Sequence, residues 1–216
     1  MAKIAVVGAT GNIGGSIVRE ALNRGHEVTA VVRDPAKLGD RPEALEVATV
    51  TDVFDPKTIA ETARGHDVVV SALGGAGKDS GVYQRAAETY VEALRGLGDE
   101  APRLIVVGGA GSLEIAPGTR LLDLPDFPEA YRPDATAQGE ALAYYRTVPD
   151  VKWTYFSPAA EIGPGTRTGG YRTDADRLVT DAAGDSRISY EDYAAALVDE
   201  IENPRYIGAR FTAAAV

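Results

Sequence analysis

The 216-residue sequence predicts an α/β fold with a doubly wound parallel sheet. Strand-like and helix-like segments alternate from end to end, which is typical of parallel strands joined by right-handed crossovers. A weak internal sequence similarity supports this prediction, because RGHEVTAVV (24–32) and RGHDVVVSA (64–72) each read as a helix end, a glycine and a strand. A glycine-rich turn between the first strand and the first helix is the third observation.

Apolar runs and helical periodicities give the order of the elements. The predicted strands are 3–7, 27–32, 45–49, 68–72, 104–107, 152–156 and 210–213. Helices are predicted at 13–22, after Asp55-Pro56 up to 65, at 82–97, at 136–146 and after Ser189 up to 203. Asp34-Pro35 also reads as an N-cap followed by the first residue of a helix. No linker divides the chain, so we expect one domain over 1–216, with 158–187 as a small substrate or lid region.

Composition excludes several classes of protein. The 44% of hydrophobic and 25% of charged residues are typical of a globular protein. The absence of cysteine excludes disulfides, thiol nucleophiles and cysteine-based zinc sites, and we expect no metal. A net charge of −10 without a basic cluster disfavours nucleic acid as a partner. We expect no membrane span and no signal peptide, and therefore a cytoplasmic protein.

The opening stretch VVGATGNIGGSIV (6–18) places Gly8, Gly11 and Gly14 directly after a strand and before a helix. The free N–H groups and the dipole at a helix N-terminus favour an anion. Glycines in such a turn let a pyrophosphate approach these N–H groups, and Gly14 would let the helix pack close to the sheet. A tight strand-to-helix turn without a ligand is the alternative, but the sequence context favours a dinucleotide site of the Rossmann type.

The end of the second strand bears on the choice of nucleotide. An acidic residue there accepts from the ribose 2′-hydroxyl, whereas an arginine accommodates a 2′-phosphate. Arg33 comes first in this sequence and Asp34 second. We therefore predict that NADP(H) is preferred over NAD(H). A shift of one residue would place Asp34 at the ribose, and Arg33 could then be a solvated surface charge.

Several motifs together resemble one family. The turn GATGNIG (8–14), VVRDP (31–35), SALGG (71–75), VVGGAGS (106–112) and the late helix segment 188–204 are similar to the atypical branches of the short-chain dehydrogenase/reductase superfamily. Within them the chain resembles the NAD(P)H-binding group that includes NmrA-like and flavin reductase-like proteins. The resemblance implies the Rossmann fold and a dinucleotide site. The cofactor-binding residues that it implies, together with those read from the turn, are Gly8, Thr10, Gly11, Asn12, Ile13, Arg33, Asp52, Val53, Ala72, Leu73, Gly74 and Gly108.

The family's usual catalytic pair, Tyr-x-x-x-Lys after the fifth strand, is absent. No lysine lies between Lys78 and Lys152, so a standard proton relay is not expected. The resemblance suggests Ser112 as a substrate-binding residue, although a loop cap is an equal alternative. Tyr131 is the second catalytic candidate, with a core or rim aromatic as its alternative. Glu161 could face the pocket or the solvent.

His26 and His66 each lie between a helix end and a strand start. Ligands of such sheets bind at the opposite edge, so we expect both histidines to be structural.

Three functions are compatible with these residues. The first is an NADPH-dependent oxidoreductase that acts on a small organic acceptor without the tyrosine–lysine pair. The second is a non-catalytic NADP-binding sensor that docks a partner protein, and the third is a nucleotide-dependent isomerase or dehydratase. We expect a small-molecule substrate, and a homodimer is possible.

Overall fold

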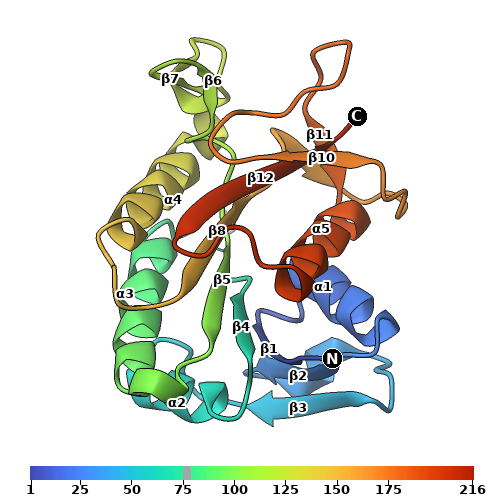
Figure 1. Cartoon of the computed structure of the whole chain (residues 1–216), viewed down its shortest axis with the longest axis vertical. Helices are drawn as coiled ribbons and strands as arrows, with labels where there is room; N and C mark the ends of the chain where they lie inside the picture. The colour runs from blue at the N-terminus through green and yellow to red at the C-terminus, as the bar shows by residue number, and fades with distance from the viewer. Residues whose placement is uncertain (75–78) are drawn as a thin grey trace.

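The computed structural model describes residues 1–74 and 79–216, and its centre is an eight-stranded sheet (Figure 1). The strand order is β10-β12-β8-β5-β4-β1-β2-β3. The sheet strands are β1 Lys3–Val7, β2 Glu27–Val32, β3 Leu45–Thr49, β4 Val68–Ser71, β5 Arg103–Val107, β8 Trp153–Ser157, β10 Tyr171–Asp174 and β12 Ala209–Ala215. Four short strands form two separate ribbons, β6 Glu114–Ala116 with β7 Thr119–Arg120, and β9 Glu161–Gly163 with β11 Arg187–Ser189.

Helices cover both faces of the sheet, as the doubly wound prediction requires (Figure 1). Helices α1 (Asn12–Asn23) and α5 (Tyr190–Glu202) lie on one face, and α2 (Pro56–Ala63), α3 (Val82–Arg95) and α4 (Arg132–Tyr145) lie on the other. Successive β-strand side chains point to opposite faces. In β1, Ile4 and Val6 therefore join the core under α1 and α5, while Ala5 and Val7 join the core under α2, α3 and α4.

The predicted Rossmann-like α/β fold is confirmed, with two differences in the C-terminal third. Strand β10 pairs antiparallel with β12, so the sheet is mostly but not entirely parallel. The expected substrate or lid region 158–187 contains β9, for which no strand was predicted, and β9 pairs with β11. Both strands are only three residues long, too short for a periodicity in sequence to reveal them.

Capping residues act largely as predicted. Asp55 accepts hydrogen bonds from the backbone N–H groups of Lys57 (3.3 Å) and Thr58 (3.0 Å) and opens α2. The Asp34 carboxylate caps Ala36 N in the same way, but only a 3₁₀ turn over Pro35–Leu38 follows. Ser189 caps α5 by accepting from Asp192 N at 3.0 Å. The Asp192 carboxylate accepts hydrogen bonds from Thr168 and Gly169, outside the helix.

The two histidines take part in local structure at the amino ends of the strands, as predicted. His26 is buried, accepts from Ala2 N at 3.1 Å and lies 3.1 Å from a Glu202 oxygen. His66 Nε2 lies 3.0 Å from the Thr29 hydroxyl oxygen. Among the described residues, no helix has the length and apolar character needed to cross a membrane.

Candidate functional site

The glycine turn lies between the parallel strands β1 and β4, where the order of successive strands changes from one side of β1 to the other. Open α/β sheets bind ligands at such a switch point. Gly8 has a φ of +85°, and a Cβ atom there would lie 2.5 Å from the Ala72 carbonyl oxygen. A Cβ atom on Gly14 would lie 2.2 Å from the Gly8 carbonyl oxygen. These two glycines let β1, β4 and α1 approach one another closely at the backbone.

Gly11 is different, because it has room around it. A Cβ atom on Gly11 would meet only the Gly8 carbonyl oxygen, at 3.4 Å. Gly11 is the N-cap of α1, and no side chain caps the first turn of that helix. The N-terminal N–H groups of α1 are therefore available to an anion.

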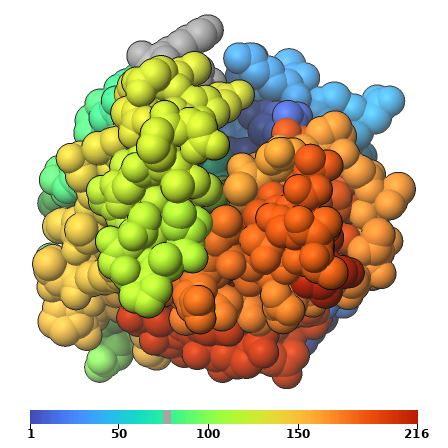
Figure 2. All heavy atoms as spheres, turned by 90° about the horizontal axis from the view of Figure 1, so that it is seen from above, coloured from blue at the N-terminus to red at the C-terminus, as the bar shows by residue number. Residues whose placement is uncertain are grey.

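Two cavities meet at the turn. A cavity of about 690 Å³, here called the α1 cavity, is lined by Thr10, Gly11 and Asn12, by the segment after β2, and by Pro164, Tyr190 and Glu191. A cavity of about 260 Å³, here called the β2 cavity, is lined by Gly8, Thr10, Arg33, Val53, Phe54, Leu73 and Gly74 among others. In Figure 2, dark-blue N-terminal atoms lie at the bottom of a hollow between the light-blue, yellow-green and orange segments.

Cationic side chains surround this hollow. Arg33 lines the β2 cavity, and Lys37 and Arg41 line the α1 cavity. Within 1–74 and 79–216, no carboxylate forms an ion pair with any of these three. Arg85, which also lines the β2 cavity, is by contrast paired with Asp79. The chain carries a net charge of −10, so three unpaired cations beside a helix N-terminus form a local attraction for anions.

Two carboxylates near Arg33 are occupied by the backbone, whereas Asp40 and Glu191 line the α1 cavity itself. Asp34 Oδ1 accepts from Ala36 N at 3.1 Å, and Asp52 Oδ1 accepts from Phe54 N at 2.8 Å. The capping role expected for Asp34 is therefore confirmed, and Arg33 is the side chain that lines the cavity.

The loop after β5 packs tightly against β8 and α4. A Cβ atom on Gly108 would lie 2.0 Å from the Tyr155 ring, and one on Gly109 would lie 1.8 Å from the Gln138 amide oxygen. The Tyr155 hydroxyl donates to the Gln138 carbonyl oxygen at 2.9 Å. Gly108 is thus explained by the packing of Tyr155 beneath it.

The two catalytic candidates lie outside the linings of these cavities. Ser112 Oγ accepts a hydrogen bond from the buried Arg210 at 2.9 Å, and Arg210 is also paired with Asp176. Tyr131 is 67% exposed at the start of α4. Glu161 is exposed and pairs with Arg187 at 3.1 Å.

The buried tyrosines near β5 are held in their neutral form. Burial raises the pKa of Tyr145 well above its ordinary value, and the neighbouring tyrosines raise it further. Burial also raises the pKa of Tyr155, more than a hydrogen bond from the Gly109 backbone lowers it. Neither phenol is suited to give up its proton near neutral pH.

Most of the predicted cofactor residues are therefore gathered around one hollow. Those that line the two cavities are Gly8, Thr10, Gly11, Asn12, Arg33, Val53, Leu73 and Gly74. Those outside the two linings are Ile13, Asp52, Ala72 and Gly108. Gly75 of the SALGG motif and Lys78 lie outside the described residues. The sequence analysis did not identify Lys37, Arg41 and Phe54 as lining residues. Lys37 and Arg41 could have been found from their positive charge in the segment that follows β2.

The family model described as NAD(P)H-binding matches residues 8–204 of this chain. The chain belongs to this NAD(P)H-binding family. Three solved structures are similar to this chain over nearly its full length, and each of the three proteins is described only by a putative name. They are an exported protein from Burkholderia pseudomallei (46% identity, TM-score 0.89, 99% of this chain and 100% of that one), an NADH-flavin reductase from Streptococcus pneumoniae (37%, 0.89, 100% and 100%) and an epimerase from Bacteroides thetaiotaomicron (41%, 0.88, 100% and 97%). The family resemblance predicted from the motifs, and the Rossmann-like fold that it implies, are therefore confirmed.

Proposed function

We propose that the protein is an NADPH-dependent reductase of a small planar organic acceptor. The observation that carries the proposal is the set of unpaired cations, Arg33, Lys37 and Arg41, around a helix N-terminus without a side-chain cap. NADP(H) carries one phosphate more than NAD(H), and a guanidinium binds phosphate through charge-assisted hydrogen bonds. Arg33 lines the cavity at the end of β2, where the ribose phosphate of a Rossmann ligand is expected.

The class of acceptor is suggested by the tyrosines of α4, which lie within the described residues and are not suited to proton donation. No tyrosine of α4 is followed by a lysine four residues later, and Tyr145 of α4 is buried with a raised pKa. A reduction in this site should therefore involve hydride transfer from bound NADPH, with the proton coming from water or from the substrate. Quinones and flavins suit such a reaction, because their reduced forms take a proton from solvent. The similar S. pneumoniae protein is described as a putative NADH-flavin reductase, which is compatible with this class of acceptor but names NADH as the nucleotide.

The nucleotide part of the proposal is tested by titrating NADPH and NADH into the wild type and Arg33→Ala. We expect the wild type to bind NADPH more tightly, and the variant to lose about tenfold to 100-fold in NADPH affinity with little change for NADH. Arg64→Ala, a cation at the far end of α2, is the matched control. Tighter binding of NADH by the wild type would refute the preference and point to Asp34 as the ribose ligand.

A non-catalytic NADP-binding sensor is the second candidate. It is favoured by the engagement of Ser112 with Arg210 and by the exposed position of Tyr131, since neither candidate lines the described cavities. The two functions are separated by incubating the protein and NADPH with a panel of quinones, flavins and aldehydes. Consumption of NADPH above the rate without protein supports the reductase. Tight NADPH binding without consumption across the panel supports the sensor.

A further inference from the structure

One exposed segment, residues 164–170, separates the α1 cavity from a neighbouring cavity. This segment, PGTRTGG, is called the strap. All seven of its residues are exposed. Pro164 lines the α1 cavity, and Pro164, Thr166 and Thr168 line the neighbouring cavity of about 430 Å³ beside β9 and β11. The strap therefore contributes to the wall of the α1 cavity through Pro164 alone.

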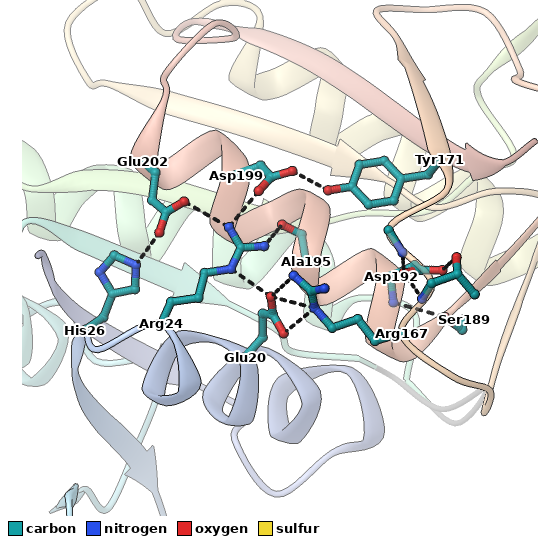
Figure 3. A network of polar contacts seen from close by, with 12 residues as sticks. Glu20, Arg24, His26, Arg167, Tyr171, Ser189, Asp192, Ala195, Asp199 and Glu202 are labelled. Atoms are coloured by element: carbon teal, nitrogen blue, oxygen red, sulfur yellow. Dashed lines mark hydrogen bonds and ion pairs between the residues drawn. The ribbon is translucent and has the colours of Figure 1, made fainter.

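The first turn of α5 holds the strap from one side (Figure 3). The Asp192 carboxylate is almost fully buried and accepts from Thr168 N (2.8 Å), Thr168 Oγ1 (2.6 Å) and Gly169 N (2.8 Å). Ser189 Oγ donates to the Thr166 carbonyl oxygen at 3.0 Å, and Gly165 N donates to Glu191 at 3.2 Å. All of these contacts use polar groups.

Helix α1 holds the strap from the other side. Arg167 donates through Nε and Nη2 to the Glu20 carboxylate, each at 2.9 Å. Glu20 also accepts from Arg24 at 2.7 Å, and Arg24 donates to Asp199 of α5 at 2.6 Å. Figure 3 shows Arg167 and Arg24 pointing toward Glu20 from two directions. The Glu20 side chain is only 8% exposed, so the two hydrogen bonds from Arg167 reach a carboxylate that is largely shielded from solvent.

The position of the strap therefore depends on the polar contacts of a few side chains. The strap buries no side chain, so little apolar burial holds it in place. Segments with few buried apolar contacts and solvent-exposed hydrogen bonds open locally at low cost. Helix α1 carries the glycine turn at its N-terminus and Glu20 in its third turn, so one rigid element sets both the phosphate end of the cavity and the position of the strap.

We infer that Glu20 and Arg167 are positioning residues for the nucleotide: their ion pair holds the strap as a wall of the α1 cavity and slows the release of bound NADPH. The inference rests on the proposed binding of NADPH at the glycine turn. Arg167 and Glu20 would then lengthen the residence time of the nucleotide without contacting it.

The experiment measures the strap and the nucleotide separately in Arg167→Ala, Arg167→Lys and the wild type. Hydrogen exchange followed by mass spectrometry reports on the amides of residues 165, 168 and 169, and stopped-flow fluorescence reports on NADPH dissociation. Arg95→Ala is the matched control, because Arg95 makes a similar two-bonded contact with Asp150 (2.7 and 2.8 Å) on the exposed surface of α3.

In Arg167→Ala we expect strap amides to exchange about tenfold faster and NADPH to dissociate about five- to tenfold faster. Arg167→Lys should restore part of both, because a lysine keeps the charge but not the fork. Arg95→Ala should change neither rate. Unchanged exchange in Arg167→Ala would overturn the ion pair as the holder of the strap. Faster exchange with unchanged NADPH dissociation would overturn its role for the nucleotide. If the wild type binds no NADPH, the proposed nucleotide function fails, and the exchange rates still decide how the strap is held.

Discussion

The two walls of the candidate nucleotide cleft are built on different physical principles. At the glycine turn, backbone meets backbone, and Gly8 and Gly14 leave no room for a Cβ atom. At the strap, the backbone is exposed, and side chains of α1 and α5 hold it through hydrogen bonds and one ion pair. Close packing resists deformation, whereas exposed polar contacts exchange with water at modest cost. We therefore expect the turn to be fixed and the strap to be adjustable.

The strongest test of the rigid wall is Gly14→Ala. The new Cβ atom would lie 2.2 Å from the Gly8 carbonyl oxygen and 2.8 Å from its carbon, so the backbone itself must move. We expect a loss of about 3 kcal/mol in the free energy of unfolding, measured by urea denaturation. Gly15→Ala is the control one residue away, because its Cβ atom would have 3.4 Å to the nearest atom and alanine favours a helix. Equal stability of the two variants would contradict the steric account.

Gly11→Val separates ligand binding from folding at the same wall. Gly11 has φ −82° and ψ 166°, which a valine adopts without strain, and its Cβ atom would have 3.4 Å of space. The branched side chain would stand where a phosphate approaches the helix N-terminus. We expect the free energy of unfolding to change by less than about 1 kcal/mol and NADPH affinity to fall about 100-fold or more. Calorimetry that finds unchanged affinity in a folded Gly11→Val variant would refute the glycine turn as the phosphate site.

The difference between the walls also explains which parts the sequence made predictable. The β1 turn is a local feature: strand, glycines and helix follow one another within residues 3–23, and the steric rules for glycine are independent of the rest of the chain. The strands β1, β2 and β3 were predicted with their observed bounds. For β1 and β2 the reason is that buried parallel strands are nearly continuous apolar runs, whereas β3 is a partly exposed edge strand.

The strap depends on contacts that no local pattern contains. Arg167 and Glu20 are 147 residues apart, and the three-residue strands β9 and β11 exist only because they pair with each other. The contact of Ser112 was unpredictable for the same reason, because its hydroxyl accepts a hydrogen bond from Arg210, 98 residues later in the chain. Arg210 is identified as its partner only once β12 is placed beside β8.

Acid should weaken the adjustable wall before the rigid one. Burial alone would raise the pKa of Glu20, but the hydrogen bonds from Arg167 and Arg24 outweigh it, and the pKa lies below its ordinary value of 4.5. A lowered folded-state pKa means that Glu20 stabilises the fold fully above about pH 4.5, and that this contribution is lost as the pH falls through the folded-state pKa. We expect the wild type to exceed Glu20→Gln by about 1 kcal/mol in free energy of unfolding at pH 7, with a smaller difference at pH 3. A difference that does not shrink on acidification would show that Glu20 acts through packing rather than charge.

The smallest effects are expected at the two residues that lie on neither wall. Ser112→Ala removes one acceptor from Arg210, which keeps its ion pair with Asp176. Tyr131→Phe removes a hydroxyl from a side chain that is 67% exposed. If the protein reduces a quinone or flavin with NADPH, each change should lower turnover by less than about threefold and leave NADPH affinity unaltered, because neither residue has an activating lysine. Turnover and NADPH affinity are measured in parallel for both variants. A loss of about 100-fold in Tyr131→Phe with intact NADPH affinity would show that Tyr131 takes part in proton transfer, and that the segment before α4 reaches the acceptor during the reaction.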